Sequence, residues 1–187
     1  PQNLYRYPGN MFVAGFIGTP QMNFFDGVIT KSGNDVCFKL DCGANIDLDY
    51  SLANKILVKY MDGAHKIVFG IRPDDVRVYN KNNYNDGSWA PAKAVVSVVE
   101  VLGGETLIYA NLNLDTPDAQ SGAIIIKANP DTEVRRGDII DIEISRRKFH
   151  VFDKDTEKSI RRRIPEENVI LASIAGGTLS FEAESFR

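Results

Sequence analysis

The sequence contains few cysteine and histidine residues, which most metal sites and many enzyme active sites use. Its 187 residues include two cysteines and two histidines. Cys37 and Cys42 have no second cysteine pair with which to complete a zinc site, and His65 and His150 do not stand at ligand spacing. We therefore expect no metal site. We interpret the two cysteines as free thiols in a reducing compartment, with a small disulfide as the alternative.

Motifs for nucleotide, acyl-transfer or zinc-hydrolase chemistry are also absent. The sequence has no G-x-x-x-x-G-K-S/T, so the backbone cradle and the lysine that hold nucleotide phosphates are missing. Gly18-Thr19-Pro20 cannot replace them, because proline removes an amide donor and no lysine follows. Neither Gly-x-Ser-x-Gly nor H-E-x-x-H occurs. We expect no catalytic residue and no cofactor-binding residue in this chain.

Long hydrophobic runs are missing as well. The longest uncharged hydrophobic run, residues 11–17, is followed at once by glycine and proline, whereas a membrane span needs about 20 apolar residues. No basic start with a cleavable small-residue site indicates a signal peptide. The sequence begins "PQNLYRYPGN", without an initiator methionine, and we interpret it as a fragment of a longer protein.

The charge balance argues against a nucleic-acid partner. A formal net charge of -3 at pH 7 gives no global attraction to nucleic acid or anionic lipid. Two basic clusters, residues 146–148 and 161–163, adjoin acidic runs and lack the interleaved aromatic residues of a base-stacking platform. They favour local charge balance or a protein contact.

What the sequence does contain is hydrophobic alternation with a period of two, which is typical of strands. Asn10 is a suitable N-cap for a short helix from Met11, and residues 2–7 are a candidate for an earlier helical turn. After Pro20, strands separated by turns predict a mainly β protein with a small OB-type barrel. We expect strands in "DGVITKSGNDVCFKL", "ANIDLDY", "HKIVFGI", "PAKAVVSVVEV", "ETLIYANLNL", "SGAIIIKANP", "GDIIDIEIS" and "KFHVFD".

The domain organisation predicted from these patterns has three parts. Residues 1–25 form a helical junction, residues 26–162 form the OB-like domain, and residues 163–187 form a C-terminal extension that could be a hairpin. The single tryptophan, Trp89, falls in the polar loop "NKNNYNDGSWAP". There it would either plug the barrel or mark a partner surface.

Four sequence blocks together resemble one protein family. In order, they are "YRYPGNMFVAGFIGTPQMNFFDG", "GIRPDDV", "VVEVLGGETLIY" and "RRGDIIDIEISRRKFHVFDKDTEKSI". This pattern, over about residues 1–162, resembles the C-terminal regulatory domain of the ATP-binding subunit of bacterial sugar ABC importers of the maltose and glycerol-3-phosphate type. The resemblance implies one or more TOBE/MOP-type OB barrels.

The resemblance also implies a function and partners. It implies a regulatory and dimerisation domain that holds two ATPase subunits together and receives regulatory proteins, on the cytoplasmic face of the cell membrane. ATP and Mg²⁺ would be bound by a separate ATPase domain, which would also contact the importer's membrane subunits. The fragment itself would not hydrolyse ATP. Phe24, Gly70 and Glu100 match family positions associated with domain contact and regulation.

Each of these three residues also has a purely structural interpretation. Phe24 could be a core residue, Gly70 could allow close backbone approach, and Glu100 could cap a strand end. Two other function classes remain open. One is a barrel that binds a small oxyanion such as molybdate, and the other is a nucleic-acid-binding barrel, which the acidic net charge disfavours.

Overall fold

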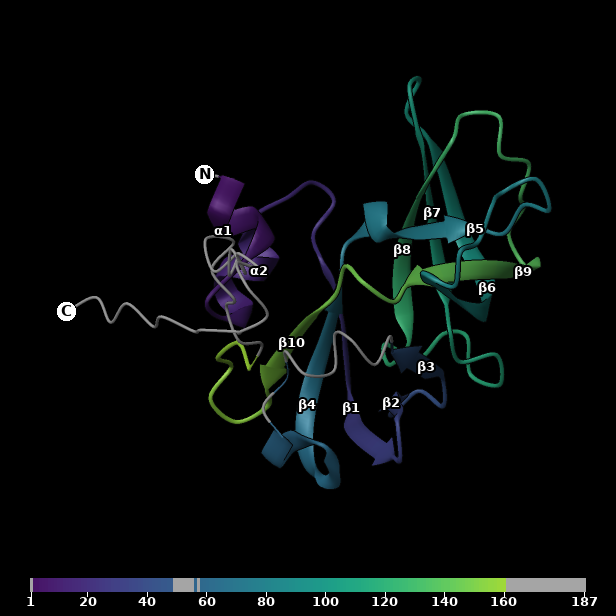
Figure 1. The fold of residues 1–187 in the computed structure, drawn as a ribbon. Coiled ribbons are helices and arrows are strands. Elements are labelled where there is room, and N and C mark those ends of the chain that lie inside the picture. The colour runs from purple at the N-terminus through teal and green to yellow at the C-terminus, as the bar shows by residue number, and fades with distance from the viewer. Residues whose placement is uncertain (1, 49–55, 57, 161–187) are drawn as a thin grey trace, which may run out of the picture.

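The computed structural model describes residues 2–48, 56 and 58–160 (Figure 1). The predicted C-terminal extension, residues 163–187, lies outside this part of the chain. Two short helices come first, α1 (Gln2–Arg6) and α2 (Met11–Phe16). Asn10 caps α2 as predicted, because its side-chain Oδ1 accepts a hydrogen bond of 2.9 Å from the Val13 amide.

The first sheet has five antiparallel strands in the order β10-β4-β1-β2-β3. Strands β1 and β2 form the predicted hairpin, with Gly33 at φ 60° in the two-residue turn. The strands of this sheet are β1 (Asn23–Ser32), β2 (Asp35–Leu40), β3 (Asn45–Leu48), β4 (Asp62–Ile71) and β10 (His150–Asp153). A 3-10 turn, η1 (Val58–Tyr60), precedes β4.

The second sheet also has five antiparallel strands, in the order β5-β9-β6-β7-β8. A 3-10 turn, η2 (Pro73–Asp75), leads into it from the first sheet. Its longest strand, β6, is joined to β7 by the predicted turn at Gly103 and Gly104. The strands are β5 (Val76–Val78), β6 (Trp89–Val101), β7 (Thr106–Asn111), β8 (Ala123–Ala128) and β9 (Ile139–Ser145).

The second sheet is inserted into the chain between two neighbouring strands of the first. The chain leaves the first sheet after β4, forms β5 to β9, and returns to add β10 beside β4 (Figure 1). One hydrophobic core serves both sheets, since buried side chains such as Phe69 of β4, Ile108 of β7 and Ile144 of β9 belong to the same cluster. The sheets therefore fold around a shared interior.

The Asn23 side chain joins the two sheets by hydrogen bonds to the backbone. Asn23, which begins β1 and is 6% exposed, donates to the carbonyl of Ile125 at 2.9 Å and accepts from its amide at 2.8 Å. Ile125 belongs to β8, an edge strand of the second sheet. The Asn23 amide group thus pairs with this edge as a further strand would.

Trp89 is the first residue of β6. The prediction that it lies in the preceding loop is therefore wrong. The Arg77 guanidinium stacks on the indole ring, 4.0 Å from its centroid. The same guanidinium donates from Nε to the buried carboxylate of Glu143 at 2.7 Å. Trp89 belongs to the strand and not to the loop because its backbone pairs with Ser145 of β9.

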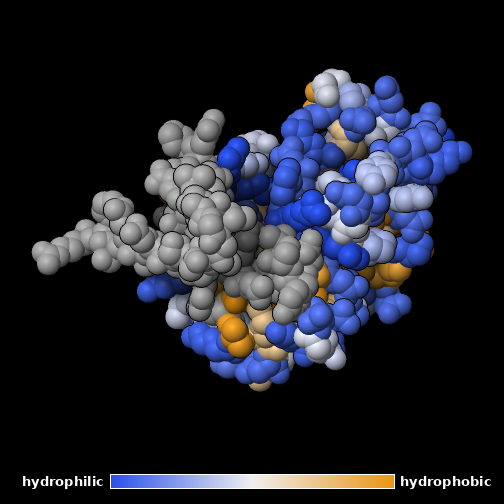
Figure 2. Space-filling view, viewed as in Figure 1, coloured by the Kyte–Doolittle hydropathy of each residue, from blue (hydrophilic) through white to orange (hydrophobic). Residues whose placement is uncertain are grey.

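The surface seen in Figure 2 is mostly hydrophilic over the second sheet, with small hydrophobic patches between hydrophilic residues. Cys37 and Cys42 are both free thiols, as interpreted from the sequence. Burial raises the pKa of each thiol. Within the part of the chain that the structure describes, no helix has the length and apolar character needed to cross a membrane.

Candidate functional site

The structure brings two of the three candidate residues together. Phe24 of β1 is paired directly with Gly70 of β4, and Gly70 is paired on its other side with His150 of β10. These three positions form one row across the first sheet. Glu100 lies near the end of β6 in the second sheet. The regulatory roles suggested for these residues stay predictions, and their positions define two separate surfaces.

The row through Phe24 lies where helix α2 packs on the first sheet. The Phe24 ring contacts Phe152 edge-on, with ring centroids 6.0 Å apart. It also lies beneath Gly15, where an added Cβ atom would come 3.3 Å from Phe24 Cε2. This contact explains why a glycine stands inside a short helix. A small apolar cluster separate from the main core holds α2 in place; its buried members are Ala14, Met22, Val68 and Phe152.

Gly70 stands at the most crowded point of this row. A Cβ atom added there would lie 2.7 Å from Met22 Sδ, 3.2 Å from Phe152 Cε2 and 3.4 Å from His150 Cβ. Glycine is therefore required for close packing, which agrees with the structural interpretation from the sequence.

We expect Gly70→Ala to lower the free energy of unfolding by about 1–2 kcal/mol, because Met22 must move to admit the methyl group. Urea denaturation measures this directly. Gly104→Ala is the matched control, since nothing lies within 4 Å of an added Cβ there, and its effect should stay below about 0.5 kcal/mol. Equal stability of the two variants would contradict the crowding argument.

Glu100 lies on a more open surface at the end of the β6–β7 hairpin. Its Oε2 accepts a hydrogen bond of 3.1 Å from the Tyr109 hydroxyl on the neighbouring strand. Burial, together with this carboxylate, raises the pKa of Tyr109. Two apolar side chains near it in the sequence are exposed: Val98, on the same strand face, is 49% exposed, and Leu102 is 54% exposed. We call Val98 and Leu102 the hairpin surface.

The residue that sequence reasoning missed is Arg72, in the "GIRP" block. It is 3% exposed and directly follows the last residue of β4. Its Nη1 donates to the carbonyl of Ile17 at 2.8 Å and its Nη2 donates to the carbonyl of Tyr5 at 2.8 Å. These carbonyls belong to the C-terminal ends of α2 and α1, where cations are favoured. Arg72 thus fastens both helices to the barrel.

The packing around Arg72 is equally specific. The guanidinium carbon lies 3.6 Å from the centroid of the Tyr5 ring, and burial lowers the pKa of the guanidinium. Its Nε atom is buried without a hydrogen-bond partner among the described residues. The available sequence signal was a charged residue immediately after the apolar run "IVFGI". Nothing in the sequence indicated that its partners would be the helix carbonyls.

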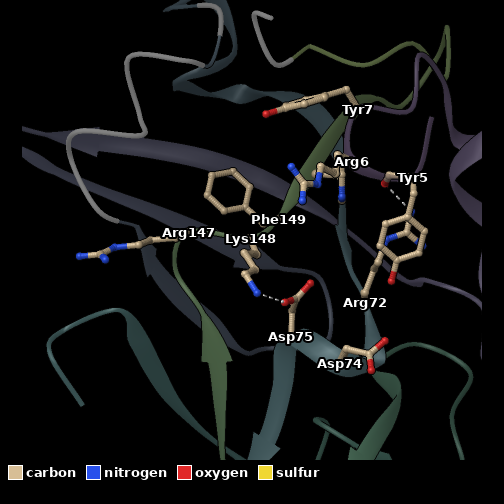
Figure 3. A pocket seen from close by; sticks show the side chains of 10 residues that line it. Tyr5, Arg6, Tyr7, Arg72, Asp74, Asp75, Arg147, Lys148 and Phe149 are labelled. Carbon is tan, nitrogen blue, oxygen red and sulfur yellow. Dashed lines mark hydrogen bonds and ion pairs between the residues drawn. The ribbon is translucent and has the colours of Figure 1, made fainter. Parts of the chain in front are cut away.

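A cavity of about 400 Å³ lies beside Arg72 (Figure 3). Three segments form its walls: residues 5–7 at the end of α1, residues 72–75 at η2, and residues 147–150 between β9 and β10. On its rim, Lys148 Nζ lies 3.4 Å from the carboxylate of Asp75. Burial raises the pKa of Asp75, and the nearby Lys148 ammonium opposes that shift. Among the described residues, no cluster of His, Cys, Asp or Glu is arranged to hold a metal ion.

These observations first define a class: a mainly β, OB-type protein whose sheets carry a docked pair of short helices. A solved structure supports this fold. The molybdate-bound form of the cytoplasmic molybdate-binding protein ModG matches with a TM-score of 0.51 at 12% identity, over 69% of this chain and 94% of that chain. The fold class predicted from the sequence is confirmed.

Sequence comparison identifies similar proteins. Residues 18–76 match the protein-family model described as the MalK OB fold domain. The chain is 32% identical over 163 residues to the oligosaccharides import ATP-binding protein MsmX of Bacillus subtilis, covering 86% of this chain and 40% of that protein. It is 31% identical over 168 residues to the trehalose/maltose import ATP-binding protein MalK of Thermococcus litoralis, covering 86% and 40%.

A third relative is similar in the same way. The alpha-glucoside transport ATP-binding protein AglK of Rhizobium meliloti is 31% identical over 153 residues, covering 82% of this chain and 38% of that protein. The resemblance to ATP-binding proteins of sugar ABC importers is thereby confirmed. The chain spans about 40% of the length of the curated relatives it matches.

Proposed function

We propose that this chain is the regulatory and dimerisation domain of an ATP-binding subunit of a sugar importer. The observation that carries the proposal is the similarity, over 86% of the chain, to proteins named for the import of oligosaccharides and of trehalose and maltose. The chain has no phosphate loop in its sequence. In the proposal it therefore regulates and positions an ATPase domain and performs no hydrolysis itself.

The remaining parts of the assembly follow from the same proposal. ATP and Mg²⁺ are bound by the ATPase domain, and this chain needs no cofactor. The complete protein works on the cytoplasmic side of the membrane, attached to the membrane subunits of the importer through that domain. A regulatory protein contacts the surface that contains Glu100, or the region of the first sheet around Phe24, where Gly70 is buried.

The hairpin surface supports the pairing of two copies. Val98 and Leu102 are 49% and 54% exposed, and Glu100 stands between them in the sequence, on the same face of β6 as Val98. Apolar side chains surrounded by polar groups are the usual composition of a protein interface. Two paired regulatory domains would also raise the effective concentration of the attached ATPase domains for one another.

The test is the oligomeric state of the 187-residue chain. We expect sedimentation to show a dimer at tens of micromolar, an order of magnitude set by small interfaces. Val98→Glu should weaken pairing by at least about tenfold, because it places a charge in an apolar contact. Val58→Glu is the control, since Val58 is 76% exposed at η1, away from the hairpin surface. A chain that stays monomeric at these concentrations would overturn the dimerisation role.

The alternative function, a barrel that binds a small oxyanion, has one observation in its favour. ModG, which shares the fold, is named as a molybdate-binding protein. At 12% identity that likeness concerns the fold alone. The sugar-importer proposal has the support of sequence relatives and is the one we adopt.

A further inference from the structure

The cavity beside Arg72 lies between the helical segment and the barrel. One wall comes from the helical segment (Tyr5, Arg6) and the opposite walls come from the barrel, where Arg72 and Lys148 lie (Figure 3). Any molecule bound here would contact both parts at once. It would add to the fastening that Arg72 already provides between them.

The cavity has a surplus of positive charge. Six charged side chains line it: Arg6, Arg72, Arg147, Lys148, Asp74 and Asp75. Without Arg147, which pairs with Asp86, three cations face two carboxylates and one positive charge remains in excess. Arg147 points away from the others and lies 3.6 Å from Asp86 (Figure 3). The cations that face an incoming ligand are therefore Arg6 and Lys148.

Arg6 is the clearest sign that the cavity takes an anionic group. Its side chain forms no hydrogen bond or ion pair with any residue in the part of the chain that the structure describes, although it lines the cavity. Arg72 also lines the cavity, but both of its terminal nitrogens already donate to the carbonyls of Ile17 and Tyr5. Guanidinium groups such as that of Arg6 are the preferred partners of phosphate oxygens.

The two carboxylates and the volume of the cavity indicate what else the ligand contains besides an anionic group. Asp74 and Asp75 would repel a bare oxyanion, but each accepts hydrogen bonds from hydroxyl groups. Asp75 is already largely withdrawn from water, with its side chain 15% exposed. The cavity of about 400 Å³ would hold about 13 water molecules at ~30 Å³ each, which is far more space than one tetrahedral anion needs. Its size is that of an ordinary small-molecule site.

The tyrosines complete the set of groups. Tyr5 and Tyr7 line the same cavity and are 37% and 38% exposed. An aromatic ring offers an apolar face to the C–H groups of a carbohydrate as well as a hydroxyl for hydrogen bonding. The Arg72 guanidinium stacks on one face of the Tyr5 ring, so Tyr5 can offer a ligand its other face and its hydroxyl. Cations for a phosphate, carboxylates for hydroxyl groups and an aromatic ring therefore meet in one place.

We propose that this cavity is a regulatory site for a phosphorylated carbohydrate. Arg6 and Lys148 bind the phosphate, Asp75 accepts from a sugar hydroxyl, and the bound molecule ties the helical segment to the barrel. The binding itself is independent of the pairing of two copies, whereas its role as a signal rests on the proposed regulatory function.

The experiment is calorimetric titration of the 187-residue chain with three probes: glucose 6-phosphate, inorganic phosphate and glucose. We expect glucose 6-phosphate to bind with a dissociation constant below about 1 mM, and the other two to bind at least about tenfold more weakly. Arg6→Gln and Lys148→Gln should each weaken binding of glucose 6-phosphate by at least about tenfold, because each removes a charge-assisted contact.

Lys93→Gln is the matched control and should leave binding unchanged. Lys93 is an exposed lysine on β6 that pairs with Asp141 at 2.6 Å, in the second sheet. Near-ultraviolet circular dichroism verifies that each variant is folded. Absence of binding up to about 10 mM, a range well above physiological affinities, would overturn the proposal. So would equal affinity for inorganic phosphate, or an equal loss of affinity in Lys93→Gln. Sedimentation of the same samples reports separately on the dimerisation role.

Discussion

Replacing Arg72 by methionine is expected to lower the free energy of unfolding by about 3–4 kcal/mol. Methionine keeps most of the apolar volume of arginine but cannot donate hydrogen bonds. The carbonyls of Tyr5 and Ile17, each now 2.8 Å from a guanidinium nitrogen, would lose charge-assisted partners worth about 1.5–3 kcal/mol each. Methionine also removes a buried positive charge, and the desolvation cost that is saved offsets part of that loss.

The substitution should also release the helical segment locally. Urea denaturation gives the change in stability, and limited proteolysis shows cleavage within residues 2–20 that the parent chain resists. Arg72→Lys should behave almost as Arg72→Met does, because a single ammonium cannot serve two carbonyls and stack on the Tyr5 ring at once.

The control for this experiment is Arg135→Met, because Arg135 is an exposed arginine in the loop before β9. Its effect should be below about 0.5 kcal/mol. If Arg72→Met cost no more than this control, the fastening role of Arg72 would be refuted. A large loss of stability without new cleavage near the N-terminus would show that Arg72 stabilises the barrel alone.

Replacing Asn23 by alanine is expected to cost about 3 kcal/mol, because it removes both hydrogen bonds by which this side chain links the first sheet to the backbone of the second. Alanine would leave the amide and the carbonyl of Ile125 without their partners, and the cavity left by the carboxamide adds to the cost. The transition should remain a single cooperative step, because one hydrophobic core spans both sheets.

Two further variants distinguish the loss of the hydrogen bonds from the loss of side-chain volume as the cause of the instability. Asn23→Asp keeps the size of the side chain and can accept from the Ile125 amide, but as a carboxylate it cannot donate to the carbonyl. It should therefore be nearly as unstable as Asn23→Ala at neutral pH. Asn45→Ala, at an exposed asparagine in β3, is the control. Chemical denaturation followed by fluorescence measures all three, and a cost below about 1 kcal/mol for Asn23→Ala would disprove the bridging role.

The strands could be predicted from the sequence because their physical signal is local. Alternation in "NFFDGVI" places Phe25 in the core and Phe24 on the opposite face, and the Gly33 and Gly103 turns mark the hairpins without tertiary information. The family pattern likewise identified the OB fold. Each of these signals is contained within a few neighbouring residues or within a short motif.

The parts that could not be predicted depend on contacts between distant segments. Arg72 reaches carbonyls that are 55 and 67 positions away along the chain, and Asn23 reaches a backbone 102 positions away. No periodicity encodes such pairs. The cavity was missed for the same reason, since its walls come from three separated segments. Nothing in the sequence around Arg6 indicated that its side chain would face such a cavity.

The insertion of the second sheet into the first has a consequence for how the chain folds. Strand β10 can pair with β4 only after residues 72–149 have been synthesised and brought back across the molecule. Closing so long a segment costs chain entropy before any of the final contacts stabilise it. During translation β4 therefore remains an open sheet edge until His150 to Asp153 have left the ribosome. Until then the open edge of β4 could pair with a strand of another chain, so the partly synthesised chain would be prone to aggregation. We expect chaperones to bind it at this stage.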